Sequence, residues 1–191
     1  AAPTYGCAFV DDWEGNRRTG SLADTMKALK LVQAEDVYDI NGGIIVQPGD
    51  IPQDVASVAM LYADLMTSDK VILLPTGYKK EMEVMLPALA EMFGGKEAFA
   101  EKPRCISLIN TVSPLSLDCR MLDCLMLLAE YGQAAILCPA AMLGVTGSVT
   151  MAGTIVSGVC ESLASMCLAQ MVRPGTPVVL GIQSTAADMR G

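Results

Sequence analysis

Histidine is absent from the sequence, and lysine and arginine are scarce: they number 13 against 21 aspartate and glutamate residues. The net charge is −8 and no basic run exceeds two residues. This argues against nucleic acid as a partner, because binding the phosphate backbone requires concentrated positive charge. Without histidine, a zinc site made of cysteine and histidine is excluded within this chain. The missing acid–base group also gives little support to a proton-shuttling hydrolase.

Paired-cysteine motifs are lacking as well. The seven cysteines include no CxxC pair, so we expect no metal site in this chain. Nearly all of them lie in apolar strand or helix patterns, which is the usage of reduced, buried thiols that pack as small hydrophobic residues.

Long hydrophobic runs are missing too. Polar residues or glycine interrupt every apolar stretch before the roughly 18 residues that a membrane span needs. No charged-then-apolar leader stands at Ala1. We therefore expect a soluble, cytoplasmic protein without membrane contact.

The composition that is present, 52% hydrophobic and 18% charged residues, indicates a packed globular chain. Short apolar runs rich in Ile, Val and Leu predict strands buried on both faces of a parallel sheet, at 70–77, 104–111, 134–141 and 176–183. Helical spacing of apolar residues predicts helices at about 52–67, 79–92, 115–132 and 149–172. The stretch 42–50 is either a further short strand or an extended approach to the sheet.

Alternating strands and helices indicate an α/β fold, either open and doubly wound or closed as a barrel. A dinucleotide-binding sheet needs GxGxxG after its first strand, and no junction here provides it. We therefore predict a TIM-type (β/α) barrel. Because a complete barrel takes roughly 200–250 residues, four or five βα units would cover roughly half to two-thirds of it. We expect residues 1–51 to form an N-terminal approach segment, residues 52–191 to hold the βα repeats, and the chain to be a segment of a larger protein.

The residues that follow the predicted strands are polar but mostly uncharged. In parallel α/β folds these loops build the active site, so the lining suits a small substrate held by hydrogen bonds and dispersion. Tyr78 is the aromatic residue at a predicted strand end. Thr76 and Asp188 lie at the same strand ends. The candidates for hydrogen bonds to the substrate are Asn110, Ser113, Thr146, Gln183 and Ser184; no catalytic residue is assigned.

The glycine-rich stretch GVTGSVTMAG, residues 144–153, lies at a strand-to-helix junction. It has no lysine or arginine to neutralise phosphates, so it does not match a Walker loop. We expect Gly144 and Gly147 to allow a tight turn, and Ser148 or Thr146 to cap the following helix.

Several segments resemble one family: INTVSPLSLDCRMLDCLMLLAEYGQ, PAAMLGVTGSVTMAGTIV, LAQMVRPGTPVVLG and STAADMRG, preceded by DDWEGNRRTGSLADTMKALKLVQ. Together they are similar, over about residues 10–191, to the trimethylamine methyltransferase family, whose members transfer a methyl group from methylated amines to a cobalt corrinoid protein. Ser148 departs from the proline that the family leads us to expect in the loop.

The resemblance implies a TIM barrel whose strand ends bind a methylated amine, with a corrinoid protein docking over the mouth. For such a cationic substrate, the ring of Tyr78 is the candidate to hold the cation. The corrinoid would be supplied by that partner and not held tightly by this chain. Trimethylamine members carry pyrrolysine in a part of the barrel that we place beyond Gly191. Other members look like enzymes for quaternary amines such as glycine betaine, carnitine or proline betaine.

The sequence thus predicts a methyltransferase that moves a methyl group from a quaternary or tertiary methylated amine, such as glycine betaine, to a corrinoid. A quaternary ammonium is already cationic and needs no general acid, which suits a chain without histidine; the catalysis would be by positioning. Two alternatives stay open: another TIM-barrel enzyme, lyase-like, or a non-catalytic small-molecule binding module. The sequence also leaves open whether the protein forms a homo-oligomer.

Overall fold

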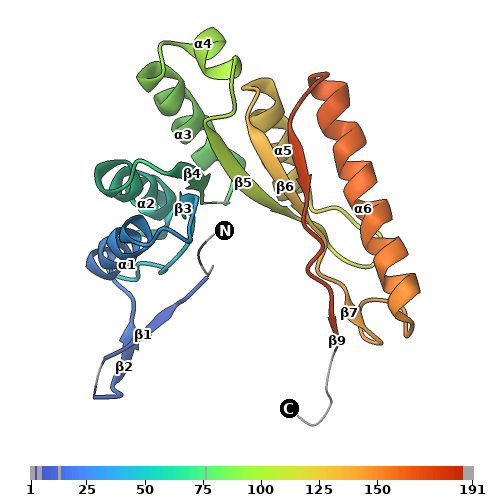
Figure 1. Ribbon diagram of the computed structural model, residues 1–191, viewed down its shortest axis with the longest axis horizontal. Helices are drawn as coiled ribbons and strands as arrows, with labels where there is room; N and C mark the ends of the chain where they lie inside the picture. The colour runs from blue at the N-terminus through green and yellow to red at the C-terminus, as the bar shows by residue number, and fades with distance from the viewer. Residues whose placement is uncertain (1–2, 4–5, 13, 76, 187–191) are drawn as a thin grey trace.

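The computed structural model describes residues 3, 6–12, 14–75 and 77–186. At its centre lies a five-stranded parallel sheet, drawn in Figure 1, with the strands in the order β3 (Ile40–Gly42), β4 (Val71–Leu74), β5 (Cys105–Asn110), β6 (Ala134–Cys138) and β8 (Val178–Leu180). The spatial order follows the chain without reversal. A doubly wound sheet reverses its order at a switch point, so this topology does not support the dinucleotide-binding alternative.

The four predicted strands are confirmed, each shorter than its apolar run. β3 ends where the stretch 42–50 begins, and it pairs with β4 in parallel, Ile40 opposite Val71. The segment 1–51, expected to be an approach to the βα repeats, therefore contributes a strand to the same sheet.

The four predicted helices are also present, as α2 (Gln53–Thr67), α3 (Lys79–Met92), α5 (Cys119–Glu130) and α6 (Met151–Val172). Figure 1 shows them on the convex side of the sheet. α5 starts four residues later than the periodicity predicts. Val112 and Ser116 pair in a β-bridge, and the Asp118 side chain then caps the helix by accepting from the Arg120 amide at 3.0 Å.

Several elements were not predicted. They are the hairpin β1 (Phe9–Asp11) and β2 (Arg17–Thr19), the helices α1 (Leu22–Ala34) and α4 (Lys96–Ala100), and the parallel pair β7 (Met142–Leu143) and β9 (Thr185–Ala186). α1 packs on α2. The β7–β9 pair extends the neighbouring strands β6 and β8 beyond their carboxyl ends.

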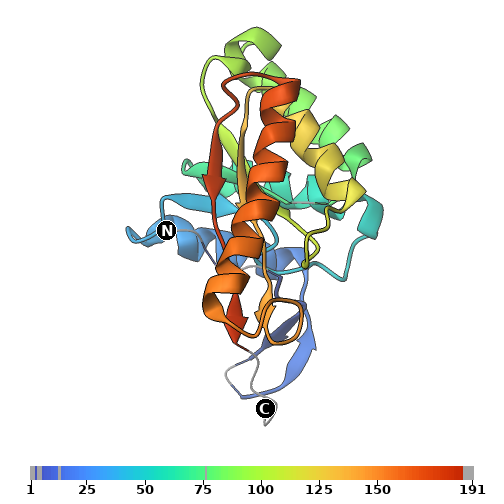
Figure 2. The same ribbon diagram turned by 90° about the vertical axis from the view of Figure 1, so that its right-hand side faces the viewer.

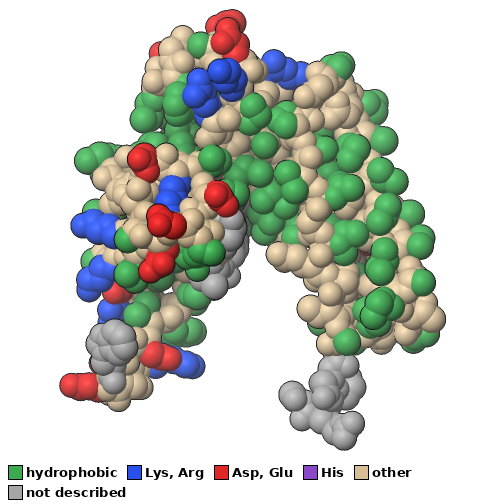
Figure 3. Space-filling view, in the orientation of Figure 1, with side chains coloured by type: hydrophobic (Ala, Val, Ile, Leu, Met, Phe, Trp, Pro, Cys, Tyr) green, Lys and Arg blue, Asp and Glu red, His purple; other side chains and the backbone are tan. Residues whose placement is uncertain are grey.

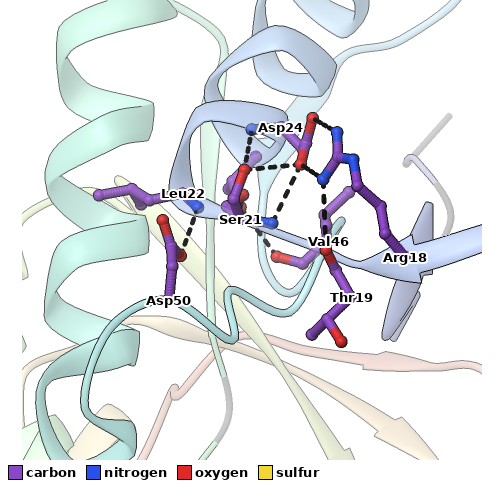
Figure 4. A network of polar contacts seen from close by, with 8 residues as sticks. Arg18, Thr19, Ser21, Leu22, Asp24, Val46 and Asp50 are labelled. Atoms are coloured by element: carbon purple, nitrogen blue, oxygen red, sulfur yellow. Dashed lines mark hydrogen bonds and ion pairs between the residues drawn. The ribbon is translucent and has the colours of Figure 1, made fainter. Parts of the chain in front are cut away.

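A polar network joins the hairpin to the start of α1 (Figure 4). The Arg18 guanidinium donates two hydrogen bonds to Asp24, at 2.6 and 2.8 Å, and the Ser21 amide and hydroxyl donate to the same carboxylate. These donors hold the pKa of Asp24 well below its usual range, the hydrogen bonds from Arg18 being the largest cause. The Leu22 amide donates to Asp50 at 2.9 Å, which ties the loop after β3 to the same corner.

The core comprises three clusters, and two of them lie on opposite faces of the central sheet because successive strand residues point to opposite faces. Between the sheet and the helices lies the larger cluster, which includes Leu74, Leu86, Leu125, Leu128 and Leu137, all fully buried. On the concave face Leu73, Ile106 and Ala134 are buried, with Ile40 and Ile136 packed against them. The third cluster joins α1, α2 and the segment after β3 through Leu29, Val32, Ile45, Val46 and Ala63. Figure 3 shows an arch-shaped molecule with hydrophobic side chains gathered where its two arms meet.

All seven cysteines are free, and the expectation that they are buried is only partly right. Cys105, Cys124 and Cys138 are buried, but four are exposed: Cys7, Cys119, Cys160 and Cys167. The last two lie on α6, whose apolar pattern continues onto its outer surface. Apolar periodicity therefore located the helix but did not show which thiols face the solvent.

Helix α6, 22 residues long, is long and apolar enough on average to cross a membrane, judged by length and composition alone, although Gly, Ser, Thr and Glu161 interrupt its apolar residues. In the structure it packs along the sheet and α5 (Figure 2), and Thr154, Glu161 and Ser165 are among its buried residues.

Candidate functional site

A cavity of about 260 Å³ opens on the concave face, near the carboxyl ends of β6 and β8. Its walls are formed by Pro3, Leu73, Leu108, Ile136, Cys138, Gly181, Ile182 and Gln183. Burial raises the pKa of the Cys138 thiol, so this group stays protonated and neutral at neutral pH. The walls of the cavity are therefore mostly apolar and carry no charge, and the side-chain amide of Gln183 is a polar group among them.

Two of the predicted substrate-binding residues belong to this region. Gln183 lines the cavity, and its backbone amide donates to Pro139 at 2.9 Å, which fixes the chain after β8 beside the end of β6. Asn110 ends β5 two residues after Leu108, on the same face of the sheet, and its register partner is Cys138. Both amides are exposed. They are thus available at the edge of an apolar cavity.

Tyr78 lies in a different place. It lines a smaller cavity, of about 180 Å³, between the first turns of α2, α3 and α5. The Arg120 guanidinium carbon lies 5.5 Å from the centre of the Tyr78 ring, so one aromatic face already has a cation. The structure therefore separates Tyr78 from the cavity that Gln183 lines.

Glu81 is the main polar residue of the smaller cavity, and the sequence analysis missed it. Its buried carboxylate accepts hydrogen bonds from the Tyr78 amide at 2.9 Å and the Ser57 hydroxyl at 3.2 Å. A side chain at Gly77 would overlap this carboxylate, so the close approach needs a glycine. The signal in the sequence is a glutamate at the third position of the helix that Tyr78 precedes, where a capping carboxylate is common.

Glu161 is the second missed carboxylate. It lies in the middle of α6, 2% exposed, and accepts hydrogen bonds from the Thr111 hydroxyl, the Ser113 hydroxyl at 2.9 Å and the Leu115 amide at 2.8 Å. These three donors span the loop after β5, which contains the cis Ser113–Pro114 bond. The Ser113 proton is thus committed to Glu161, and a contact with a substrate would have to use the oxygen as acceptor.

The glycine-rich loop is shaped by its own hydrogen bonds. The Thr146 hydroxyl accepts from the Met142 amide at 3.0 Å, and Gly144 adopts a positive φ of 73°, as the predicted tight turn requires. The predicted cap was wrong: Thr150, not Ser148 or Thr146, caps α6 by accepting from the Gly153 amide at 3.2 Å. Ser148 accepts from the Thr150 amide instead.

Ser184 lines a third cavity, of about 380 Å³, between the β7–β9 pair and the first turns of α6. Its buried hydroxyl has no hydrogen-bond partner among the residues that the structure describes. Thr76 and Asp188, also expected at the strand ends, lie outside the described residues. Of the six predicted binding residues, Gln183 lines the concave cavity and Asn110 pairs with its lining residue Cys138. Tyr78 and Ser184 line two other cavities, and Ser113 and Thr146 lie in the loops after β5 and β7.

Metal-ligating side chains do not gather in the described part of the chain. No group of three or more His, Cys, Asp or Glu residues there is arranged to hold a metal ion. Burial also raises the pKa of Cys105 and Cys124, which disfavours the thiolate form that binds metals.

Comparison with known families assigns the chain. A sequence profile described as trimethylamine methyltransferase (MTTB) matches residues 1–191. The chain belongs to the trimethylamine methyltransferase family. Its similarity therefore extends over the whole chain, including the N-terminal segment that carries β1, β2 and α1.

Individual members of the trimethylamine methyltransferase family show the range of this similarity. A glycine betaine methyltransferase from Desulfitobacterium hafniense (strain Y51) is 40% identical over 98% of this chain. A proline betaine:corrinoid methyltransferase from Eubacterium limosum is 29% identical over 98%, and a trimethylamine methyltransferase from D. hafniense (strain DSM 10664 / DCB-2) is 25% identical over 97%. The chain spans 39%, 41% and 37% of these relatives, respectively.

Proposed function

We propose that the protein transfers a methyl group from a quaternary amine that also carries a carboxylate, such as glycine betaine, to a corrinoid. The observation that carries the proposal is the uncharged, apolar cavity at the carboxyl ends of β6 and β8. The 40% identity to a protein named glycine betaine methyltransferase supports the same substrate class. Other relatives named for proline betaine and trimethylamine define the competing substrates.

The cavity walls suit the methylated end of such a substrate. Leu108, Ile136 and Cys138 offer dispersion contacts to N-methyl groups and exclude water from them. The amides of Gln183 and Asn110 lie at the edge, where they would donate hydrogen bonds to a carboxylate. One methyl group would then be held in a fixed direction, which is catalysis by positioning.

The transfer itself needs no proton from this chain. The C–N bond breaks, the methyl carbon bonds to the reduced cobalt of the acceptor, and the electron pair of the C–N bond stays on the departing tertiary amine. Because the leaving amine is neutral, no general acid is required. This accounts for a cavity without a charged side chain among its lining residues.

We propose that a separate protein supplies the corrinoid and docks at the carboxyl edge of the sheet. The relative named proline betaine:corrinoid methyltransferase supports a corrinoid as the methyl acceptor. We further propose that the sheet is part of a TIM-type barrel. Its strand order follows the chain and its helices cover the convex face, as in one segment of a barrel wall.

Filling the cavity tests the proposed site. Replacing Ile136 with phenylalanine in the intact protein should raise the KM for glycine betaine at least tenfold, which corresponds to about 1.4 kcal/mol of lost binding. Val179→Phe is the matched control. Val179 is the register partner of Ile136 on β8 and about half exposed, but it does not line the cavity. A KM for I136F equal to that of the parent protein would exclude this cavity as the binding site.

A further inference from the structure

Glu161 holds the loop after β5 from inside the fold. Its carboxylate accepts hydrogen bonds from the Thr111 hydroxyl, the Ser113 hydroxyl and the Leu115 amide, and Figure 1 shows the chain after β5 reaching α6 before it turns into α5. All three donors are neutral, and no lysine or arginine among the described residues forms an ion pair with this buried charge. A glutamine in its place would offer one acceptor oxygen to three donors. The carboxylate is therefore matched to this loop.

The loop begins at Asn110, which we place at the carboxylate of the substrate. Asn110 is the last residue of β5 to pair with β6, opposite Cys138 of the cavity wall. Its side-chain amide is exposed and forms no hydrogen bond with another described residue. The direction of this amide is therefore set by the backbone alone. The backbone that follows it is held by Glu161 through the Thr111 hydroxyl.

Helix α6 also contacts the other side of the cavity. One turn before Glu161, a methyl group added to Gly158 would lie 3.4 Å from Ile182 and 3.5 Å from Pro139, so α6 packs closely on both. Ile182 lines the cavity, and the Pro139 carbonyl accepts from the Gln183 backbone amide at 2.9 Å. Successive turns of α6 thus contact both chain segments that carry the amides proposed to bind the substrate carboxylate. The position of this helix sets the distance between those two segments.

We propose that Glu161 is a positioning residue for the substrate: it holds Asn110 where the side-chain amide donates a hydrogen bond to the substrate carboxylate. The inference rests on the proposed function, because the substrate must carry a carboxylate for this contact to form. Glu161 itself does not line the concave cavity and acts through the backbone of the loop. Loss of such an interaction, made equally in the ground state and the transition state, raises KM and changes kcat little.

The kinetics of methyl transfer from glycine betaine to cob(I)alamin test this role in the intact protein. Glu161→Gln should raise the KM about tenfold and change kcat less than threefold. Thr111→Val removes one of the three donors and should give the same pattern in a milder form, in a variant that keeps the buried carboxylate. Thr176→Val is the matched control. Its buried hydroxyl donates to the Arg173 carbonyl at 2.7 Å just beyond the far end of α6, so this variant should be less stable but keep the KM of the parent protein.

A double-mutant cycle with Asn110→Ala identifies the route by which Glu161 acts. If Glu161 acts through Asn110, the N110A/E161Q variant should have the KM of N110A within a factor of two. The same holds for N110A/T111V. Additive increases, about a hundredfold in N110A/E161Q, would overturn this role and leave the proposed function standing, and so would KM values in E161Q and T111V equal to that of the parent protein. A parent protein that transfers no methyl group from glycine betaine would overturn the proposed function and this role with it.

Discussion

Glu161 on α6 accepts a hydrogen bond from the Ser113 hydroxyl at 2.9 Å, although the two residues are 48 positions apart. The contact joins the loop after β5 to the helix after β6, on the edge where the candidate substrate residues lie. Because the same carboxylate also holds Thr111 and Leu115, one buried side chain fixes the path of the whole loop.

Replacing Glu161 should therefore destabilise the protein. Hydrogen bonds to charged groups contribute about 1.5–3 kcal/mol each, and unpartnered buried donors add a cost. We expect Glu161→Gln to lower the free energy of unfolding by roughly 1–3 kcal/mol and Glu161→Ala by more, measured by urea denaturation. Glu83→Gln, at an exposed site on α3, should change it by less than about 0.5 kcal/mol. Equal effects of E161Q and E83Q would show that the carboxylate does not hold the loop.

The Arg18–Asp24 pair gives a stability term that depends on pH. The folded-state pKa of Asp24 is depressed below the value of about 3.9 for an unfolded chain. Its contribution is therefore complete above about pH 4 and is lost as the pH falls toward the folded-state pKa. Asp24→Asn should cost roughly 1–2 kcal/mol at pH 7, reduced from the range for buried pairs because Arg18 is half exposed, and less at pH 2.5.

Urea unfolding of D24N and the parent protein at both pH values measures this difference. Asp36→Asn, at an exposed site after α1, is the control and should cost little at either pH. A D24N penalty of the same size at pH 2.5 and pH 7 would contradict the assigned role of the carboxylate.

The burial of Asp64 predicts that stability changes with pH in the opposite direction. This α2 residue is 2% exposed, its Oδ1 has no partner among the described residues, and burial raises its pKa to about 7. The unfolded chain loses the proton near pH 4 and the folded protein near pH 7, so stability falls as the pH rises between these values and is level above them. The total fall is up to about 4 kcal/mol.

Asp64→Asn should remove most of that fall, so the variant should gain stability relative to the parent protein at pH 8 but not at pH 4.5. Thermal unfolding at the two pH values reports the difference. Asp54→Asn, on the exposed start of the same helix, should follow the parent curve. Parallel curves for D64N and the parent protein would mean that Asp64 does not ionise in this range.

Gly77 should not tolerate alanine. The added methyl group would overlap the Glu81 carboxylate and displace it from the Tyr78 amide. We expect Gly77→Ala to destabilise the protein by about 1–3 kcal/mol. Gly158→Ala on α6 is the matched control. Its methyl group would meet no atom closer than 3.4 Å, and alanine favours the helix, so stability should stay level or rise. A neutral G77A variant would show that Glu81 is free to move.

The sequence pattern predicted the repeating elements well because burial is periodic. Helix α3 occupies the predicted residues, and Met82 and Met85 lie on its buried stripe. The hairpin around Arg17 was missed because its strands are three residues long and mostly exposed, so they have no apolar alternation. Helix α1 was missed although Ser21 and Asp24 form a capping box at its start.

The positions of some candidate site residues could be predicted for a similar reason. Asn110 and Gln183 could be placed because each follows a buried strand, and parallel strands end at one edge. Glu161 could not be placed by that logic, because its partners lie 46–50 residues away in the chain. Its signal was available in another form: it is the single charged residue in an apolar helix of 22 residues, and a buried carboxylate needs donors.

The most direct test of the central proposal is methyl transfer by the purified intact protein to free cob(I)alamin under reducing conditions. With glycine betaine as donor, we predict the absorbance of methylcobalamin and the release of one dimethylglycine per methyl group transferred. Proline betaine and trimethylamine serve as competing donors, and I136F should lower the rate at subsaturating glycine betaine while V179F should not. Binding of glycine betaine without methylcobalamin formation from any of the three donors would contradict the proposed activity and favour a binding module.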